Sequence, residues 1–192
     1  DRVRDALNFY LKPHPFVVLR AAPAPAGWNP RFSAVARRYT YAILNRRARP
    51  GLERRVWHVP QLLDAGKMQA GALHLLGRHD FTSFRAASCQ ARSPLRTLDR
   101  LEVRREGDLV LVHAEARSFL HHQVRNMVGT LKLVGEGRWA PALVEAALAA
   151  RDRGAAGPTA PPEGLTLTGV RYETDPFTPA DSGRTPAAAC RH

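Results

Sequence analysis

Residues 98–117 read LDRLEVRREGDLVLVHAEAR, and this stretch decides the fold class. Leu98–Arg105 and Asp108–Arg117 both resemble β-strands, because apolar and β-branched residues recur along each of them. Glu106-Gly107 stands between the two segments and is typical of a tight turn. The stretch therefore predicts a β-hairpin, whose two strands are antiparallel.

Outside residues 98–117, four further segments have the composition of strands: Phe16–Leu19, Arg38–Leu44, Val56–Val59 and Leu165–Tyr172. The intervening residues 21–30 and 154–164 are rich in Pro and Gly and predict loops. Residues 78–97 are polar and predict irregular structure.

The clearest predicted helix is Phe119–Val134. Its apolar residues are spaced by four, three, four and three, at Leu120, Val124, Met127, Leu131 and Val134. Residues 1–12, Asp64–Leu76 and Pro141–Arg151 are also expected to be helical. The predicted helices are separated along the chain from the hairpin-like strands. This order indicates the α+β class, a mostly antiparallel sheet with helices packed on one face.

The composition limits what kind of protein this is. The 192 residues are 44% hydrophobic, which is enough for a core, and no run of apolar residues is long enough to span a membrane. No signal peptide is recognisable, and two cysteines are too few for a disulfide scaffold. These features favour a reducing, cytoplasmic location.

The net charge of +12 points to a polyanionic partner. A GC-rich genome would explain the choice of Arg over Lys, but not the excess of positive charge. Fourteen arginines lie in two segments, seven in residues 37–55 and seven in residues 78–105. Clustering of this kind is what phosphate neutralisation requires, although it does not identify the polyanion.

The strand predicted over Arg38–Leu44 carries an aromatic residue in a basic setting. In a regular strand Tyr39 shares one face with Tyr41 and Ile43, while Arg38 lies on the other. A tyrosine beside arginines can stack on an unstacked base while its neighbours hold phosphate. The alternative is a core or cross-strand tyrosine with two solvated arginines, Arg37 and Arg38.

The helix predicted over Phe119–Val134 has a second, non-apolar face. His121, Arg125 and Lys132 are expected on it, since their spacings are close to whole turns. Gly129 lies near this face and would let a backbone or ligand approach. A guanidinium here could clamp a carboxylate or phosphate; the alternative is an ordinary amphipathic helix. The adjacent His121 and His122 do not form a recognisable metal site.

Residues 77–85 place His79, Asp80 and Ser83 close together in the chain. Members of a hydrolytic triad normally come from separate segments, so the spacing does not favour one. A turn in which Asp80 or Thr82 caps backbone donors is expected instead.

Taken together, these segments resemble the TruA family of tRNA pseudouridine synthases. The likeness runs in order from about residue 5 to about residue 173. It rests on residues 31–41, Gly77–Arg85, Ser118–Gly129, Ala150–Arg153, Ala160–Leu165 and Val170–Tyr172.

The resemblance implies an isomerase that converts uridines in the anticodon stem and loop of tRNA, at positions 38–40, to pseudouridine. It implies a homodimer with no cofactor and no catalytic metal. In this family an aspartate attacks the nucleotide, a tyrosine stacks on the base and acts in proton removal, and an arginine pairs with the aspartate. The tyrosine maps to Tyr39 and the arginine to Arg125. We expect Arg37, Arg38, Arg85, His121 and Lys132 to contact RNA.

One element of the family pattern is missing from this sequence. The family's aspartate lies in a Gly-Arg-Thr-Asp-Ala-Gly-Val-His-like motif, and none of the nine aspartates here has an equivalent setting. Gly183-Arg184-Thr185 imitates the opening, but Pro186 follows it. Because the covalent step needs a carboxylate nucleophile, the 192-residue chain is expected to be inactive and N-terminally incomplete.

The expected organisation has three parts. Residues 1–30 would be the end of the N-terminal half with a linker, residues 31–174 the catalytic C-terminal domain, and residues 175–192 a disordered tail. The alternative function is a non-catalytic basic RNA-binding module. A DNA-binding protein is a weaker alternative, because no helix-turn-helix or zinc-finger pattern is present.

Overall fold

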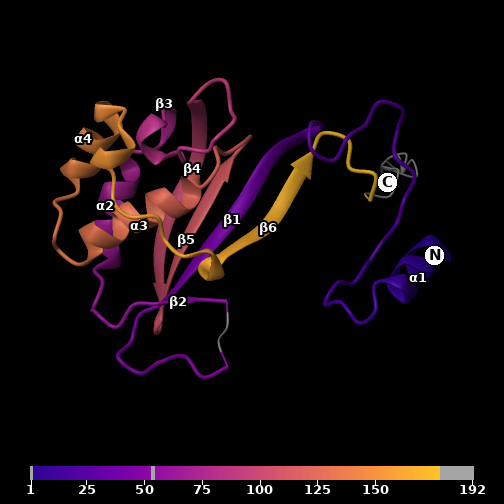
Figure 1. Cartoon of the computed structure of the whole chain (residues 1–192), viewed down its shortest axis with the longest axis horizontal. Coiled ribbons are helices and arrows are strands. Elements are labelled where there is room, and N and C mark those ends of the chain that lie inside the picture. The colour runs from indigo at the N-terminus through magenta and orange to yellow at the C-terminus, as the bar shows by residue number, and fades with distance from the viewer. Residues whose placement is uncertain (1, 53–54, 178–192) are drawn as a thin grey trace, which may run out of the picture. The chain divides into compact units, whose positions relative to one another are not determined.

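The structure is a computed structural model that describes residues 2–52 and 55–177 (Figure 1). The chain divides into two units, one of residues 1–33 with 172–192 and one of residues 34–171. Most of the predicted tail, residues 178–192, lies outside the described residues. The first unit contains helix α1 (Arg2–Tyr10). The second unit contains the sheet and the other helices.

A six-stranded sheet forms the centre of the second unit. Its strands are β1 (Ala34–Leu44), β2 (Trp57–His58), β3 (Gly77–Asp80), β4 (Leu95–Glu106), β5 (Leu109–Ala116) and β6 (Leu165–Tyr172). They are ordered β2-β1-β5-β4-β3, and β6 also pairs with β1. The predicted hairpin is confirmed as β4 and β5, which pair in antiparallel from Leu98 to Glu106. At its turn Gly107 adopts φ +59°, a backbone conformation that favours glycine.

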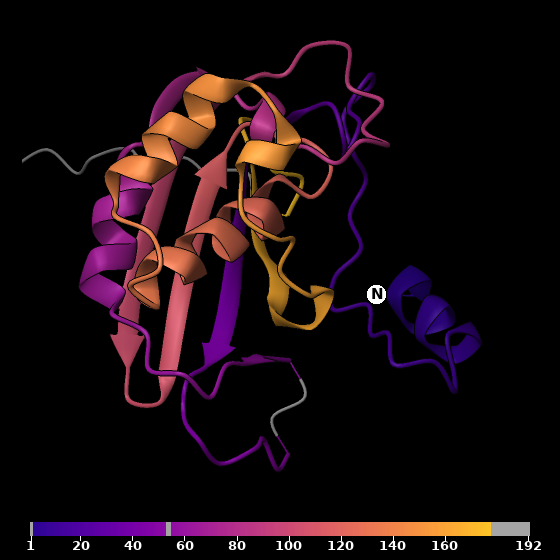
Figure 2. The same cartoon turned by 60° about the vertical axis from the view of Figure 1, so that its left-hand side comes forward.

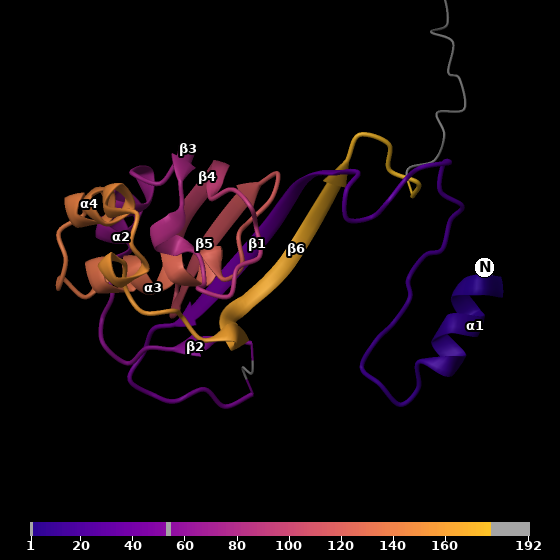
Figure 3. The same cartoon turned by 45° about the horizontal axis from the view of Figure 1, so that its top comes forward.

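Most neighbouring strands are antiparallel. β1 pairs in antiparallel with β5, and β3 with β4, whereas β1 and the short β2 are parallel. β6 also pairs with β1 in antiparallel. Gly164, just before β6, lies beside Ala42, whereas Gly169, further along β6, lies beside Arg38, which comes earlier in β1. The two strands run side by side in Figures 1 and 3.

Cross-strand rows of apolar residues build one face of the sheet. Tyr41 and Ile43 of β1 lie opposite Val112 and Val110 of β5, and all four side chains are buried. Residues directly opposite each other point to the same face, so these pairs form one continuous apolar surface. Tyr39 belongs to the same face, as the strand periodicity predicts.

Three helices cover this face. They are α2 (Ala65–Leu73), α3 (Gln123–Gly135) and α4 (Ala142–Ala150), and Figure 2 shows all three on the same side of the sheet. The buried residues of α3 include Val124, Met127, Leu131 and Val134, four of the five on which its prediction rests. The α+β class with helices on one face is therefore confirmed.

Two predicted segments differ from the structure because tertiary contacts replace local preference. Residues 16–19 are not a strand, since the Asn8 side chain bonds both backbone groups of Val18, at 2.7 and 2.9 Å. Residues 78–97 are not wholly irregular. They contain most of β3, which pairs with β4, and a turn of 3-10 helix at Thr82–Phe84.

The predicted start of the long helix is also wrong. The helix begins at Gln123 rather than at residue 119, because His122 adopts the left-handed conformation with φ 62°. The Gln123 side chain accepts a hydrogen bond of 2.8 Å from the Leu120 amide and closes the turn before the helix. His121 therefore lies outside α3.

Candidate functional site

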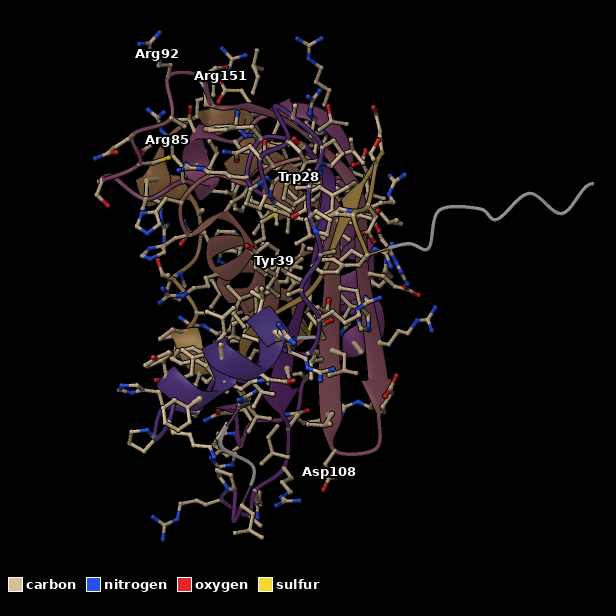
Figure 4. All side chains as sticks on the ribbon, turned by 90° about the vertical axis from the view of Figure 1, so that its right-hand side faces the viewer. Trp28, Tyr39, Arg85, Arg92, Asp108 and Arg151 are labelled. Atoms are coloured by element: carbon tan, nitrogen blue, oxygen red, sulfur yellow. The ribbon has the colours of Figure 1, made fainter. Side chains whose placement is uncertain are left out.

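Tyr39 lies at the margin of the core, on the helix-covered face of the sheet (Figure 4). Its ring is half-buried and meets the ring of Phe119 edge-on, with centroids 5.3 Å apart. Phe119 comes from the connection between β5 and α3. Among the residues that the structure describes, the Tyr39 hydroxyl has no hydrogen-bond partner. The residue thus presents a supported ring and an unengaged hydroxyl.

Tyr41 lies two residues further along the same face but has a different setting. Its side chain is fully buried, and its hydroxyl donates a hydrogen bond of 2.6 Å to the Pro161 carbonyl. Burial raises the pKa of the Tyr41 phenol above its ordinary value. Tyr41 therefore ties β1 to the segment before β6, and it is held as a neutral structural residue.

Arg125 lies in the first turns of α3 and is half-buried. Its Nε donates to the Ala160 carbonyl at 2.6 Å, and its Nη1 donates to His122 Nε2 at 3.0 Å. The Ala160 amide returns a bond of 3.1 Å to the Arg125 carbonyl. Within the described part of the chain, Nη2 has no hydrogen-bond partner. The guanidinium is therefore fixed on two sides and open on one.

The two adjacent histidines occupy the turn before α3. Their rings lie 3.9 Å apart, and His121 Nδ1 is 3.4 Å from the Ser88 hydroxyl. Sequence periodicity places His121 beside Arg125, but the structure places His122 there. The left-handed φ of His122 is the reason that this ring, and not that of His121, meets Arg125. The sequence of two adjacent histidines does not indicate which of the two rings turns inward.

His122 is held in its neutral form. Burial lowers its pKa, and the neighbouring His121 and Arg125 act in the same direction. Because Arg125 is always a donor, His122 Nε2 must accept the bond between them, which places the ring proton on Nδ1. The imidazole is thus a fixed acceptor that orients the guanidinium.

The remaining cationic residues predicted to contact RNA are spread over the second unit. Lys132 lies seven residues beyond Arg125 on α3 and pairs with Glu136 at 2.6 Å. Both partners are largely buried, with side chains 18% and 10% exposed. Arg38 pairs with Glu115 at 3.3 Å on the face away from the helices, while Arg37 donates to the Arg117 carbonyl. The structure therefore does not bring Lys132 to the Arg125 cluster.

Asp80 acts as a local cap, as its sequence setting predicts. Its Oδ1 accepts bonds from the Thr82 amide at 2.9 Å and the Thr82 hydroxyl at 2.6 Å. Although burial works in the opposite direction, these bonds and the charges of Arg151 and Arg85 hold the pKa of Asp80 below its ordinary range. Arg85, Arg151 and Arg92 lie at one end of the second unit in Figure 4, and Asp108 lies at the other.

A buried polar network positions α3, and sequence reasoning missed it. Asn126 is fully buried and donates to the Phe84 carbonyl at 2.8 Å. Its Oδ1 accepts from Thr159 at 2.6 Å and from Arg153 at 3.2 Å. Arg153 also donates to the Gly157 carbonyl at 2.9 Å. These bonds join three distant segments next to Arg125.

Comparison with known proteins identifies the family. A family model described as tRNA pseudouridine synthase matches residues 72–173. A protein of Acidiphilium cryptum named tRNA pseudouridine synthase A is 70% identical over 177 residues, which cover 91% of this chain and 69% of the relative. This chain belongs to the tRNA pseudouridine synthase family.

Other members of the synthase family are also similar. The proteins named tRNA pseudouridine synthase A of Gluconobacter oxydans and Rhodospirillum centenum are 58% and 60% identical. The matches cover 92% and 90% of this chain, and 64% and 71% of the two relatives. The chain therefore spans about two thirds of the length of these synthases.

Two further observations concern metals and membranes. Within residues 2–52 and 55–177, no three side chains of His, Cys, Asp or Glu lie close enough to hold a metal ion together. No described helix combines the length and apolar character needed to cross a bilayer.

Proposed function

We propose that this chain carries the base-stacking tyrosine, Tyr39, and the positioning arginine, Arg125, of a tRNA pseudouridine synthase. The enzyme would isomerise uridines at positions 38–40 of the anticodon stem and loop, as a cytoplasmic homodimer and without a cofactor. Family membership supports the reaction. The single observation that carries the residue assignment is the Tyr39 ring, half-buried against Phe119 with its hydroxyl unengaged.

Tyr39 is the better candidate of the two neighbouring tyrosines. The Tyr41 hydroxyl is already bonded to Pro161 and its ring is enclosed. Tyr39 is only half-buried, and its hydroxyl, which has no partner among the described residues, can exchange a proton. A target uridine must leave its stack to react, and an aromatic surface lowers the free energy of that extruded state.

Arg125 suits the role of partner to a carboxylate. His122 and Ala160 hold its Nη1 and Nε, which leaves Nη2 to meet an acidic group. A guanidinium fixed in this way loses little conformational entropy when it forms the pair. Its partner in the family is the nucleophilic aspartate, and this sequence has no match to the motif that contains that aspartate.

RNA would be held by Arg37, Arg38, Arg85 and His121, with Lys132 as a more distant contact. The Arg38 side chain is 54% exposed in its pair with Glu115, so it can exchange this partner for phosphate. Lys132 would have to leave Glu136 before it could bind RNA.

The 192-residue chain alone is proposed to bind tRNA without turning it over. Asp80 is the most tempting substitute for the nucleophile in this sequence, but Thr82 and Arg151 engage both of its carboxylate oxygens. A carboxylate held in this way is poorly placed to attack a sugar carbon.

Tritium release from tRNA labelled at C5 of uridine tests the proposal. The 192-residue chain is compared with a version extended at its N-terminus by the segment of the Acidiphilium cryptum relative that the match does not cover. We expect release from the extended version and none from the chain alone. Release by the chain alone would show that it holds its own nucleophile and would return Asp80 to consideration.

The alternative is a non-catalytic RNA-binding module, which the clustered arginines of residues 37–55 and 78–105 would also fit. The same experiment separates the two functions. An extended version that binds tRNA with high affinity and releases no tritium supports the module and contradicts the synthase.

A further inference from the structure

A hollow with an arginine-rich lining lies at the end of the sheet where β3 pairs with the start of β4 and where β5 ends. Its lining residues are Arg78, Leu95, Arg96, Thr97, Arg117 and Ser118. Three arginines thus contribute to one concave surface, and no acidic residue lines it. Like charges brought together in this way repel each other unless an anion lies between them.

The three arginines have few partners of their own. Within the described residues, the side chains of Arg78 and Arg117 make no hydrogen bond or ion pair. Arg96 Nη1 donates to the carbonyls of Ser93 at 3.0 Å and Leu95 at 2.6 Å. Its Nε is buried and has no partner. A buried N–H group without an acceptor is unfavourable, so Arg96 has an unmet hydrogen-bond requirement.

The lining chemistry favours phosphate as a ligand. A guanidinium presents two parallel N–H groups that match two oxygens of a phosphate, and three of them can surround one or two such groups. The hydroxyls of Thr97 and Ser118 add neutral donors. A second hollow, beside Asn45, is also lined by two arginines, Arg46 and Arg47, but Arg46 there pairs with Asp108 at 3.2 Å.

The hollow is continuous in the chain with the Tyr39 site. Ser118 lines the hollow, and the next residue, Phe119, packs against the Tyr39 ring. Consecutive residues are only about 3.8 Å apart at Cα, so the connection after β5 contributes to both places, although the register turns Arg78 and Thr97 to the sheet face opposite Tyr39. We propose that Arg78, Arg96 and Arg117 bind a backbone phosphate of the tRNA. This inference rests on the proposed function.

The test measures tRNA affinity of the 192-residue chain at several salt concentrations by filter binding. The triple variant Arg78→Gln, Arg96→Gln, Arg117→Gln is compared with a control that removes equal charge elsewhere, Arg47→Gln, Arg49→Gln, Arg104→Gln. We expect the affinity of the first variant to fall roughly tenfold further than that of the control. The slope of log K against log salt should decrease by about 0.7 for each phosphate that the variant no longer neutralises.

Each outcome bears on a different claim. Equal losses in both triple variants would overturn the subsite, since the arginines would then act only through overall charge. A parent chain that fails to bind tRNA at all would contradict the proposed function instead. If the first variant loses binding of inorganic phosphate, measured by calorimetry, but keeps its tRNA affinity, the ligand is a free anion and the RNA subsite is wrong. If the triple variant misfolds, the single variant Arg117→Gln is tested in the same way. Arg117 is exposed on the connection after β5, so its replacement should not disturb folding.

Discussion

At the residue scale, Tyr39 and Tyr41 show how neighbouring residues of one type acquire different surroundings. Both lie on the same face of β1. The difference is a partner 120 residues away in the chain, because the Pro161 carbonyl engages one hydroxyl and leaves the other open. The same distinction separates His121 from His122, where one backbone dihedral decides which ring meets Arg125.

Tyr39→Phe in the N-terminally extended enzyme is expected to leave tRNA affinity within about twofold, because the ring and its stacking surface are kept. Turnover should fall on the order of 100-fold or more, since a positioned proton-transfer group is removed. Filter binding and tritium release measure the two effects.

Tyr41→Phe is the matched control for that experiment. It leaves the Pro161 carbonyl without its donor, so the free energy of unfolding should drop by about 1–3 kcal/mol. If Tyr39→Phe turned over tRNA as fast as the wild-type enzyme, the proposed role in proton removal would be refuted.

His122 predicts a pH dependence of stability. Its pKa is lowered in the folded chain, so below about pH 6.5 the unfolded chain binds more protons than the folded one. The contribution to the free energy of unfolding is therefore complete above about pH 6.5 and decreases as the pH falls below it. Urea unfolding from about pH 5 to about pH 7.5, which brackets the ordinary histidine pKa, measures the trend.

His122→Asn, which tolerates the left-handed backbone, should flatten that trend, whereas His14→Asn in the other unit should not. An unchanged pH slope in His122→Asn would show that protonation of this ring does not control stability.

At the element scale, α3 depends on a close backbone approach. A Cβ added at Gly129 would lie 2.9 Å from the Pro158 carbonyl carbon and would overlap the carbonyl oxygen, so no side chain fits there. The position of Gly129 on α3 predicts the close approach of a backbone or a ligand, and in the structure the backbone of Pro158 approaches it. This contact and the Asn126 network hold the segment of residues 153–160 against the helix.

Gly129→Ala is therefore expected to destabilise the chain by about 3 kcal/mol, because backbone atoms rather than a flexible side chain must move. Urea unfolding provides the measurement. Gly66→Ala in α2 is the control, since its added Cβ meets only the Asp64 side chain, at 3.2 Å, and alanine favours helix. Similar losses in both variants would argue against the close approach as the cause.

The elements that the sequence predicts best are those in which apolar residues recur with the spacing of a strand or a helix. The β4–β5 hairpin, β6 and the body of α3 are of this kind. β3 escaped prediction because Gly77, Arg78, His79 and Asp80 are poor strand formers that become a strand only by pairing with β4. The first turn before α3 was wrongly predicted as helix because apolar spacing continues through Leu120, where the backbone does not.

At the scale of the whole molecule, the excess positive charge gives a prediction about partners. The chain should bind tRNA with a steep dependence on salt, because its arginines displace counterions from phosphates. Duplex DNA at equal phosphate concentration should displace tRNA only weakly, since an aromatic site such as Tyr39 recognises unstacked bases. Competition filter binding at two salt concentrations tests this. Equal displacement by duplex DNA would indicate a general polyanion binder.

The sequence by itself determined the fold class, the family, the arginine content and the candidate residues for the chemistry, Tyr39 and Arg125. These properties follow from local periodicity, composition and ordered motifs. Only the tertiary structure decided which tyrosine hydroxyl is open, which histidine fixes Arg125, and which arginines share a hollow. Those outcomes depend on contacts between segments far apart in the chain, such as β1 with Pro161 and β3 with the end of β5, and no local pattern encodes them.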